Sequence, residues 1–168
     1  MAPLLGVSTR FVGRLLVDIG WMPRYLRFLG LRSAAEQALD GGNSGRAVQL
    51  ARELLAAADG YASDWYYGNA VHHAHIVLGR AALRAGDRPT ARTELIEAGR
   101  TPGSPQLDTF GPNMRLAREL VDLDERDIVL AYMDLCRVFW QSGQDRLARW
   151  SADIALGRTP DFGPNLDY

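Results

Sequence analysis

All 3 histidines of the chain fall in one short stretch, at His72, His73 and His75. On a helix, His72 and His75 share a face, whereas His73 points about 100° away from His72. Imidazoles in such a cluster can act as a general base, orient a polar ligand or bind a metal ion. No motif fixes the further ligands that a metal ion needs, so we expect no metal site.

Aromatic and amide side chains precede the histidines by one or two helical turns: Trp65, Tyr66, Tyr67 and Asn69. Their flat faces and polar tips favour a surface for a peptide or a small organic ligand. Two structural interpretations stay open beside this one. The aromatic residues can form a hydrophobic seam between helices, and Asn69 can serve only as an N-cap.

A duplicated pair of motifs dominates the second half of the chain. Gly-Arg-Thr-Pro at 99–102 leads to Phe-Gly-Pro-Asn at 110–113, and both motifs recur at 157–160 and 162–165. Such internal repeats indicate an architecture of related units. We expect Phe110 and Phe162 to plug gaps between helices, and the tail 161–168 to pack back on the rest of the chain.

The segment 100–112 that ends in the first copy is rich in Pro, Gly and Ser and shows no periodicity. It is therefore predicted to be a loop, and loops of this length in a compact domain are often functional. Asp108 and Thr109 lie in this segment, and Asn113 follows it as the expected cap of the next helix.

Apolar residues recur at helical spacing through nearly the whole chain, and no segment reads as a strand. Residues 10–19 form an amphipathic pattern, and Ser33 and Glu36 have the spacing of a capping box that starts a short helix. Capping and stop signals give the expected helices, at about 33–40, 43–59, 64–85, 88–98, 113–123, 126–141 and 145–156.

Small and large residues in this pattern resemble the tetratricopeptide repeat, a helix-turn-helix unit. The matching positions of one unit are Leu78, Gly79, Gly86, Ala91, Leu95 and Ala98, those of a second are Leu135, Gly143, Ala148, Ala152 and Ala155, and those of a weaker third are Gly42, Ala47, Ala51 and Leu54. Three positions depart from the family pattern: His75 and Ala82 replace aromatic residues, and Cys136 replaces a glycine. The matching units are unevenly spaced. Gly68-Asn69, His72-His73 and the string 104–114 are also similar to strings in a family of small bacterial proteins.

The resemblance implies an all-α fold, an irregular array of tetratricopeptide-like helical hairpins. We expect one helical domain over 1–168, with an amphipathic N-terminal segment at 1–32, the hairpins at 33–160 and the tail at 161–168. Proteins of this resemblance mostly bind peptides or proteins in a concave groove, and the resemblance transfers no specific binding residue.

Composition excludes several function classes. A net charge of −1 provides no field for a nucleic acid, and the 19 basic residues are all arginine, so no internal lysine can form a Schiff base. Cys136 stands alone, so no internal disulfide or paired-cysteine site can form. With no recognisable signal segment, we expect a cytoplasmic protein without a cofactor.

The N-terminal segment is net basic. Five arginines, at positions 10, 14, 24, 27 and 32, are opposed only by Asp18. Residues 10–32 could therefore lie on an anionic membrane surface, or they could cap the first hairpin. Amphipathic helices also pack against copies of themselves, so a homo-oligomer stays open.

Two functional hypotheses follow. The first is a binding or adaptor protein that holds a peptide or protein segment in a groove between the 64–85 helix and the 100–112 loop; its expected ligand-binding residues are Trp65, Tyr66, Asn69, His72, His75, Thr109 and Asn113. The alternative is a small cofactor-free enzyme of specialised metabolism, an isomerase, cyclase or hydrolase. In that case His72 or His75 is the general base, and Tyr67 or Asp108 is its partner.

Overall fold

The computed structural model describes residues 23–167, so the amphipathic pattern at 10–19 lies outside the described residues. Within 23–167 the chain forms eight α-helices and no strand, which confirms the all-α prediction. The α-helices are α1 (Arg24–Asp40), α2 (Ser44–Ala58), α3 (Tyr67–Arg84), α4 (Arg88–Gly99), α5 (Pro105–Phe110), α6 (Arg115–Asp122), α7 (Arg126–Phe139) and α8 (Gln144–Ala155). Short 3-10 helices cover Asp59–Tyr61 (η1), Gln141–Gly143 (η2) and Gly163–Leu166 (η3).

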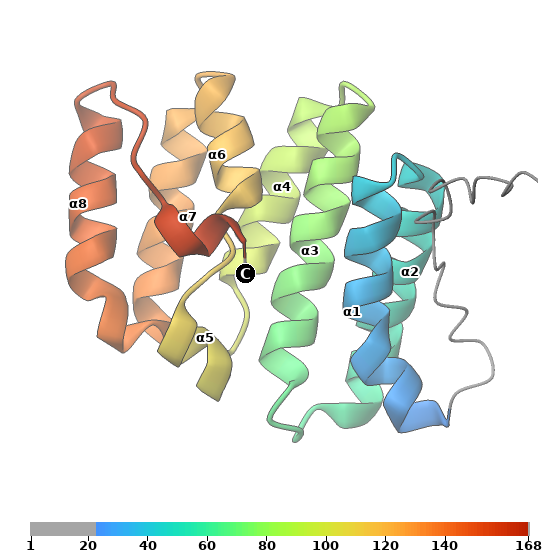
Figure 1. The fold of residues 1–168 in the computed structure, drawn as a ribbon. Coiled ribbons are helices and arrows are strands. Elements are labelled where there is room, and N and C mark those ends of the chain that lie inside the picture. The colour runs from blue at the N-terminus through green and yellow to red at the C-terminus, as the bar shows by residue number, and fades with distance from the viewer. Residues whose placement is uncertain (1–22, 168) are drawn as a thin grey trace, which may run out of the picture.

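The helices stand side by side in sequence order, with one interruption. α1 packs on α2, α2 on α3, α3 on α4, α4 on α7, and α7 on α8. The helices α5 and α6 separate α4 from α7 in the sequence but lie in front of α7, next to α3 (Figure 1). The chain therefore continues the stack from α4 directly to α7 and places the inserted segment on one face.

Small residues permit the closest helix contacts. A Cβ added to Gly79 of α3 would lie 2.3 Å from Leu116, and one added to Gly99 of α4 would lie 2.9 Å from Leu135. Substitution at either position would thus push α3 from α6 or α4 from α7. The matching alanines of the last unit behave differently: Ala148, Ala152 and Ala155 are all exposed on α8. They face away from the core, which α8 contacts through Leu147, Trp150 and Ile154.

The start of the array differs from the sequence prediction. α1 runs without a break from Arg24 to Asp40, so the short helix predicted at 33–40 and the boundary between 32 and 33 are wrong. Phe28, Leu31 and Ala35 continue one buried stripe through that point. Ser33 is exposed within the helix, so the capping-box spacing there has no capping role.

The predicted starts of two other helices are confirmed. The Asn43 side chain accepts the N–H of Arg46 at the start of α2, and Asp87 accepts the N–H of Thr90 at the start of α4. The first turn of α4 contains Pro89, as expected. These caps satisfy N–H groups that a helix end otherwise leaves open.

The segment 100–112 was predicted as a loop but contains the short helix α5. Ser104 caps this helix by accepting the N–H of Leu107 at 3.0 Å, and Pro105 occupies its first turn. A Ser-Pro pair is a helix-start signal, and the lack of a longer apolar period concealed it. The next helix, α6, starts at Arg115, and Asn113 accepts that residue's N–H at 2.9 Å from just outside the helix.

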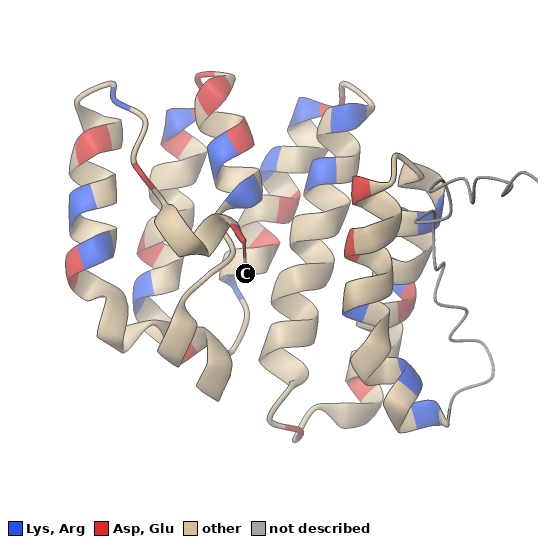
Figure 2. Ribbon diagram, viewed as in Figure 1, with Lys and Arg blue, Asp and Glu red and all other residues tan. Residues whose placement is uncertain are grey.

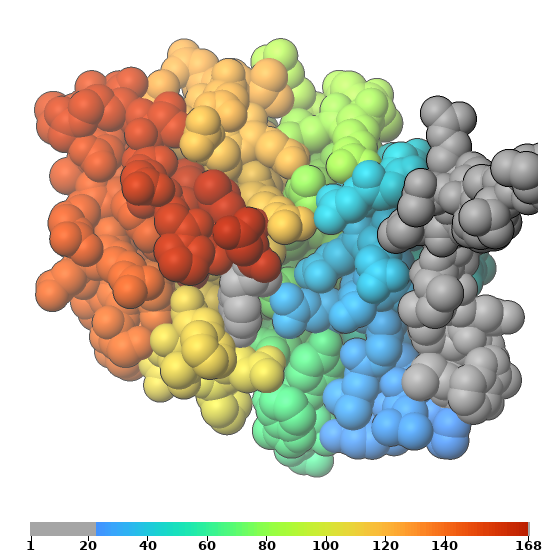
Figure 3. Space-filling view, in the orientation of Figure 1, coloured from blue at the N-terminus to red at the C-terminus, as the bar shows by residue number. Residues whose placement is uncertain are grey.

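The C-terminal tail packs back on the array, as the sequence predicted. It passes in front of α7, runs below α6 and lies against α5 (Figures 1 and 3). Phe162 and Asn165 are each only 1% exposed. Phe162 belongs to the hydrophobic cluster formed by α3–α8, whereas a second cluster joins α1, α2 and α3.

Candidate functional site

His72 is completely buried between α3, α4 and the start of α6. Its Nδ1 lies 3.0 Å from the carbonyl oxygen of Ala98, and its Nε2 accepts the N–H of Asn113 at 3.0 Å. The neutral ring with a proton on Nδ1 fits both contacts. Burial holds the pKa of His72 well below its ordinary range. Both nitrogens are thus occupied in linking three backbone segments, which leaves neither for a ligand.

His73 is directed towards α1, and its ring meets that of His72 edge-on, with ring centroids 5.1 Å apart. Its Nδ1 lies 3.2 Å from Glu36, which also contacts Arg32 at 3.2 Å. Burial lowers the pKa of His73, although Glu36 opposes that shift. Burial alone would raise the pKa of Glu36, but His73 and Arg32 lower it to about 2. This group is an internal link between α1 and α3.

His75 contacts Glu94, a side chain of α4. Its Nδ1 lies 2.7 Å from Oε2 of Glu94, and both side chains are less than one-fifth exposed, at 17% and 19%. Glu94 also lines a depression of about 220 Å³ between α2, α3 and α4, together with Arg52 and Leu78. A carboxylate that orients an imidazole is an arrangement found in general-base catalysis. His72 and His75 share the face of α3 that meets α4, as predicted, but each has its own partner.

The predicted groove between α3 and the 100–112 segment is closed. A Cβ on Gly68 would lie 1.7 Å from the carbonyl oxygen of Gly103, so the two backbones are in direct contact. Buried Asn69 accepts the hydroxyl of Ser104 at 2.8 Å and donates to the side chain of Gln106. Asn69 therefore fastens the segment to α3 and is not open to a ligand.

The aromatic residues before the histidines separate into different roles. Tyr66 is 7% exposed and packs edge-on against Phe28, with ring centroids 5.5 Å apart. Trp65 is 52% exposed and contacts Tyr66, and Tyr67 is half-buried. The hydrophobic-seam interpretation thus describes Tyr66, whereas Trp65 remains a surface side chain.

The remaining predicted site residues lie on or next to α5. Asp108 accepts the N–H of Gln141 at 3.1 Å and, through its backbone carbonyl, the hydroxyl of Ser142 at 2.6 Å. Thr109 donates its hydroxyl to the carbonyl of Pro105. Neither residue lies in the groove that the sequence predicted, and Asp108 instead ties α5 to the link between α7 and α8.

The best-defined site in the described residues holds the protein's own tail. The Trp150 Nε1–H donates to the carbonyl of Asp161 at 2.9 Å. Phe162 packs edge-on against the same indole, with ring centroids 5.2 Å apart at 76°. Trp140 lies behind Trp150 at 5.7 Å. An aromatic pocket thus receives the phenylalanine of the second Phe-Gly-Pro-Asn copy.

Asn165 joins the second copy of the motif to the first. Its Nδ2 donates to the carbonyl oxygens of Phe110 at 3.0 Å and Pro112 at 2.9 Å, and its own carbonyl accepts the N–H of Met114 at 2.9 Å. Gly111 makes this approach possible. It has a φ of +89°, and a Cβ there would lie 2.8 Å from Nδ2 of Asn165 and 2.6 Å from Trp140.

The seated tail leaves an open depression beside it. Thr109, Phe110, Arg146, Pro164 and Asn165 line this depression, whose volume is about 290 Å³. The Phe110 side chain is 56% exposed, so the prediction that it plugs a gap is wrong. Arg146 lies over the Trp140 ring, 5.8 Å from its centroid, and forms no ion pair with any residue of 23–167.

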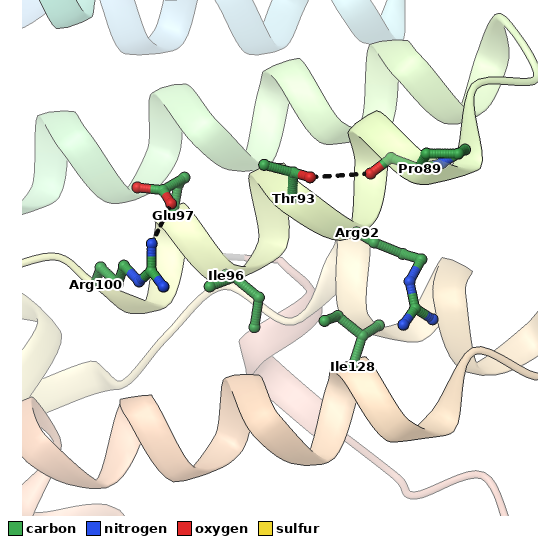
Figure 4. A pocket seen from close by; sticks show the side chains of 7 residues that line it. All are labelled: Pro89, Arg92, Thr93, Ile96, Glu97, Arg100 and Ile128. Atoms are coloured by element: carbon green, nitrogen blue, oxygen red, sulfur yellow. Dashed lines mark hydrogen bonds and ion pairs between the residues drawn. The ribbon is translucent and has the colours of Figure 1, made fainter.

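A larger depression, about 430 Å³, lies between α4 and α7 (Figure 4). Ile96 and Ile128 form its apolar floor. Its arginines are already paired, Arg92 with Asp127 at 2.7 Å and Arg100 with Glu97 at 2.6 Å. Unlike the site of the tail residues 161–166, this surface offers no unpaired arginine among its lining residues.

Residues 23–167 present no grouping of three or more His, Cys, Asp and Glu side chains suited to a metal ion. Acidic and basic residues intermix over the helices in Figure 2, in line with the balanced charge of the sequence. None of the described helices is long and apolar enough to cross a membrane. Cys136 is buried in α7, where burial raises the pKa of its thiol, as expected of a core residue rather than a nucleophile.

Several residues of the tail site were missed by sequence reasoning. In the sequence, Trp140 and Trp150 are recognisable only as apolar residues of their helices. Met114 acts through its backbone N–H, which any residue other than proline would supply. Arg115 donates to the carbonyl of Leu166. The repeated Phe-Gly-Pro-Asn was the available signal, since two copies of one motif can contact each other.

Comparison of the chain with protein-family models, curated proteins and solved structures found no match.

Proposed function

We propose that this protein is a binding module for a short linear segment of a partner protein, built on a tetratricopeptide-like array. The seating of the tail carries this proposal. Residues 161–166 bind the array through a pocketed aromatic ring, main-chain hydrogen bonds and one side-chain amide. Protein modules recognise short peptide segments through main-chain hydrogen bonds and pockets for individual side chains.

The helix order supports the array part of the proposal. Successive antiparallel pairs α1–α2 and α3–α4 use buried small residues, Ala47, Ala91 and Ala98, where the helices meet. These are positions at which the tetratricopeptide pattern requires small side chains. The insertion of α5 and α6 lengthens the spacing between the units of Ala91 and Ala148, and it supplies one wall of the tail site.

A peptide-display selection tests this function directly. The full chain and its Phe162→Ala variant would be exposed to a random peptide library, and bound peptides would be located by hydrogen exchange. We expect the variant to enrich a peptide family that protects residues 110–115. A selection that enriches no peptide on either protein contradicts the proposal.

The His75–Glu94 contact supports a second candidate, the small cofactor-free enzyme. The 2.7 Å contact aligns an imidazole with a carboxylate beside the 220 Å³ depression. If the depression is a catalytic site, Glu94→Gln lowers kcat for a substrate found by metabolite screening while the protein remains folded. Equal turnover by wild type, His75→Ala and Glu94→Gln rules out this role.

A further inference from the structure

The tail site contacts the two outer side chains of Phe-Gly-Pro-Asn, those of Phe162 and Asn165. Phe162 fills the pocket beside Trp150, and a smaller or polar side chain would leave that pocket empty or unsatisfied. Asn165 supplies two N–H groups to the carbonyls of Phe110 and Pro112. An aspartate there would have no N–H to donate, so both carbonyls would lose their partner.

The two central residues of the motif set its backbone. Gly163 has a φ of +52°, a conformation that residues with a side chain rarely adopt. Pro164 lies in the first turn of η3, where its ring fixes φ without losing a needed N–H. Gly-Pro therefore presets the turn that brings Phe162 and Asn165 to their separate partners.

The tail is attached to the array by an exposed link. Leu156 is 66% exposed, residues 157–159 are exposed as well, and Gly157 turns the chain with a φ of +76°. α8 already makes its own contacts with α7 through Leu147, Trp150 and Ile154. We therefore expect the helices to stay assembled when the tail departs and opens the site.

We propose that this site is a receptor for Phe-Gly-Pro-Asn segments of a partner protein, and that the chain's own tail is their intramolecular competitor. This inference rests on the proposed peptide-binding function and names its ligand. Arg146 has no ion pair within 23–167 and faces the depression beside Pro164. A partner segment with an acidic side chain near its Pro-Asn pair gains a contact that the tail does not make.

The effect of the tail on the affinity for a free peptide can be predicted. A segment tethered by a short link has an effective concentration in the millimolar range, so a free peptide competes poorly with it. A substitution that weakens the binding of the tail lets the free peptide compete more effectively for the site. The synthetic peptide Asp-Phe-Gly-Pro-Asn-Leu-Asp-Tyr should therefore bind a tail-weakened protein at least about tenfold more tightly than the wild type.

The experiment measures fluorescence anisotropy of this labelled peptide with three full-length proteins: wild type, Phe162→Ala and Val138→Ala. Val138 is 76% exposed and distant from the motif in sequence, so its variant is the matched control. We expect only the Phe162→Ala protein to bind the peptide tightly. We expect no protein to bind a peptide in which Phe or Asn is replaced by Ala. Circular dichroism checks that each variant is helical, and Asn165→Ala replaces Phe162→Ala if the latter does not fold.

Equal, weak binding by the wild type and the folded tail variant overturns the receptor proposal. So does a display selection that enriches peptides unrelated to Phe-Gly-Pro-Asn, although the general peptide-binding function then survives. A wild-type dimer that forms with rising concentration and is lost in Phe162→Ala also overturns it, because the occupant is then the tail of a second copy.

Discussion

The two Phe-Gly-Pro-Asn copies have the same four residues and opposite surroundings. Phe162 is 1% exposed, whereas Phe110 is 56% exposed. The amide of Asn165 donates to two carbonyls of the first copy, whereas the Asn113 side chain accepts the N–H of Arg115. The first copy is held between α5 and α6 and presents its backbone. The second follows an exposed link and presents its side chains, so position in the chain decides which copy is bound.

Removing the two phenylalanines one at a time should separate the copies most widely. Phe162→Ala should lower the free energy of unfolding by about 3 kcal/mol, because a buried ring is lost. Phe110→Ala should change it by less than about 0.5 kcal/mol, since that ring is largely exposed. Urea denaturation measures both values. Losses of similar size in the two variants would remove the distinction between receptor and ligand.

The two glycines of the motif differ in a second way. Gly111→Ala combines a φ of +89° with a Cβ 2.6 Å from Trp140, whereas Gly163→Ala, at a φ of +52°, meets nothing within 4 Å. We expect Gly111→Ala to cost about 2–3 kcal/mol and Gly163→Ala about 1 kcal/mol. Thermal unfolding of the two variants checks the order. A larger loss in Gly163→Ala is incompatible with the close approach at Gly111.

The two asparagines test the hydrogen bonds that join the copies. Asn165→Ala leaves the carbonyls of Phe110 and Pro112 without their donor, at a cost of about 2 kcal/mol. Asn113→Ala removes the acceptor of the Arg115 N–H and should cost less, about 1 kcal/mol. Denaturation curves of the two variants give the difference. A larger loss of stability in Asn113→Ala than in Asn165→Ala would show that the hydrogen bonds of Asn165 are not the main link between the two copies.

Acid should loosen the first copy through His72. Burial keeps the pKa of His72 well below its ordinary range, and His73 shifts in the same direction. The unfolded chain therefore takes up protons below about pH 6.5 while the folded chain does not, so stability is full above that pH and is lost below it. Each such histidine contributes a slope of up to about 1.4 kcal/mol per pH unit.

The variant His72→Gln should show a smaller loss between about pH 6.5 and 5 than the wild type. Denaturation midpoints collected across this range give the two slopes. Identical slopes would show that His72 is not held neutral by the fold, and its contact with the Asn113 N–H would then lose its role in fixing the first copy.

Periodicity and capping residues predict most of this fold, because local signals determine where helices form. Asn43 and Asp87 cap the helices that the sequence assigned to them. The same rule failed at Ser33, where the buried stripe of Phe28, Leu31 and Ala35 carries α1 through a capping signal. Tertiary burial outweighs a single cap when the two disagree.

The site was less predictable, because it depends on which distant residues meet. The sequence singled out His72 and Asn69 as ligand-binding residues, but their polar groups form hydrogen bonds within the protein. It predicted that the tail folds back but not that Asn165 contacts the carbonyls of Phe110 and Pro112. No spacing rule encodes a contact between segments more than fifty residues apart, and only the repetition of the motif pointed to it.

Amide hydrogen exchange, resolved by NMR, tests the receptor and ligand roles most directly. The Met114 N–H donates to Asn165, and the neighbouring Asn113 N–H donates to His72. In Phe162→Ala we expect the Met114 amide to exchange at least about tenfold faster while the Asn113 amide stays protected, and we expect the added octapeptide to restore Met114. A Met114 amide that keeps its wild-type rate in the variant, or that the peptide fails to protect, contradicts the account.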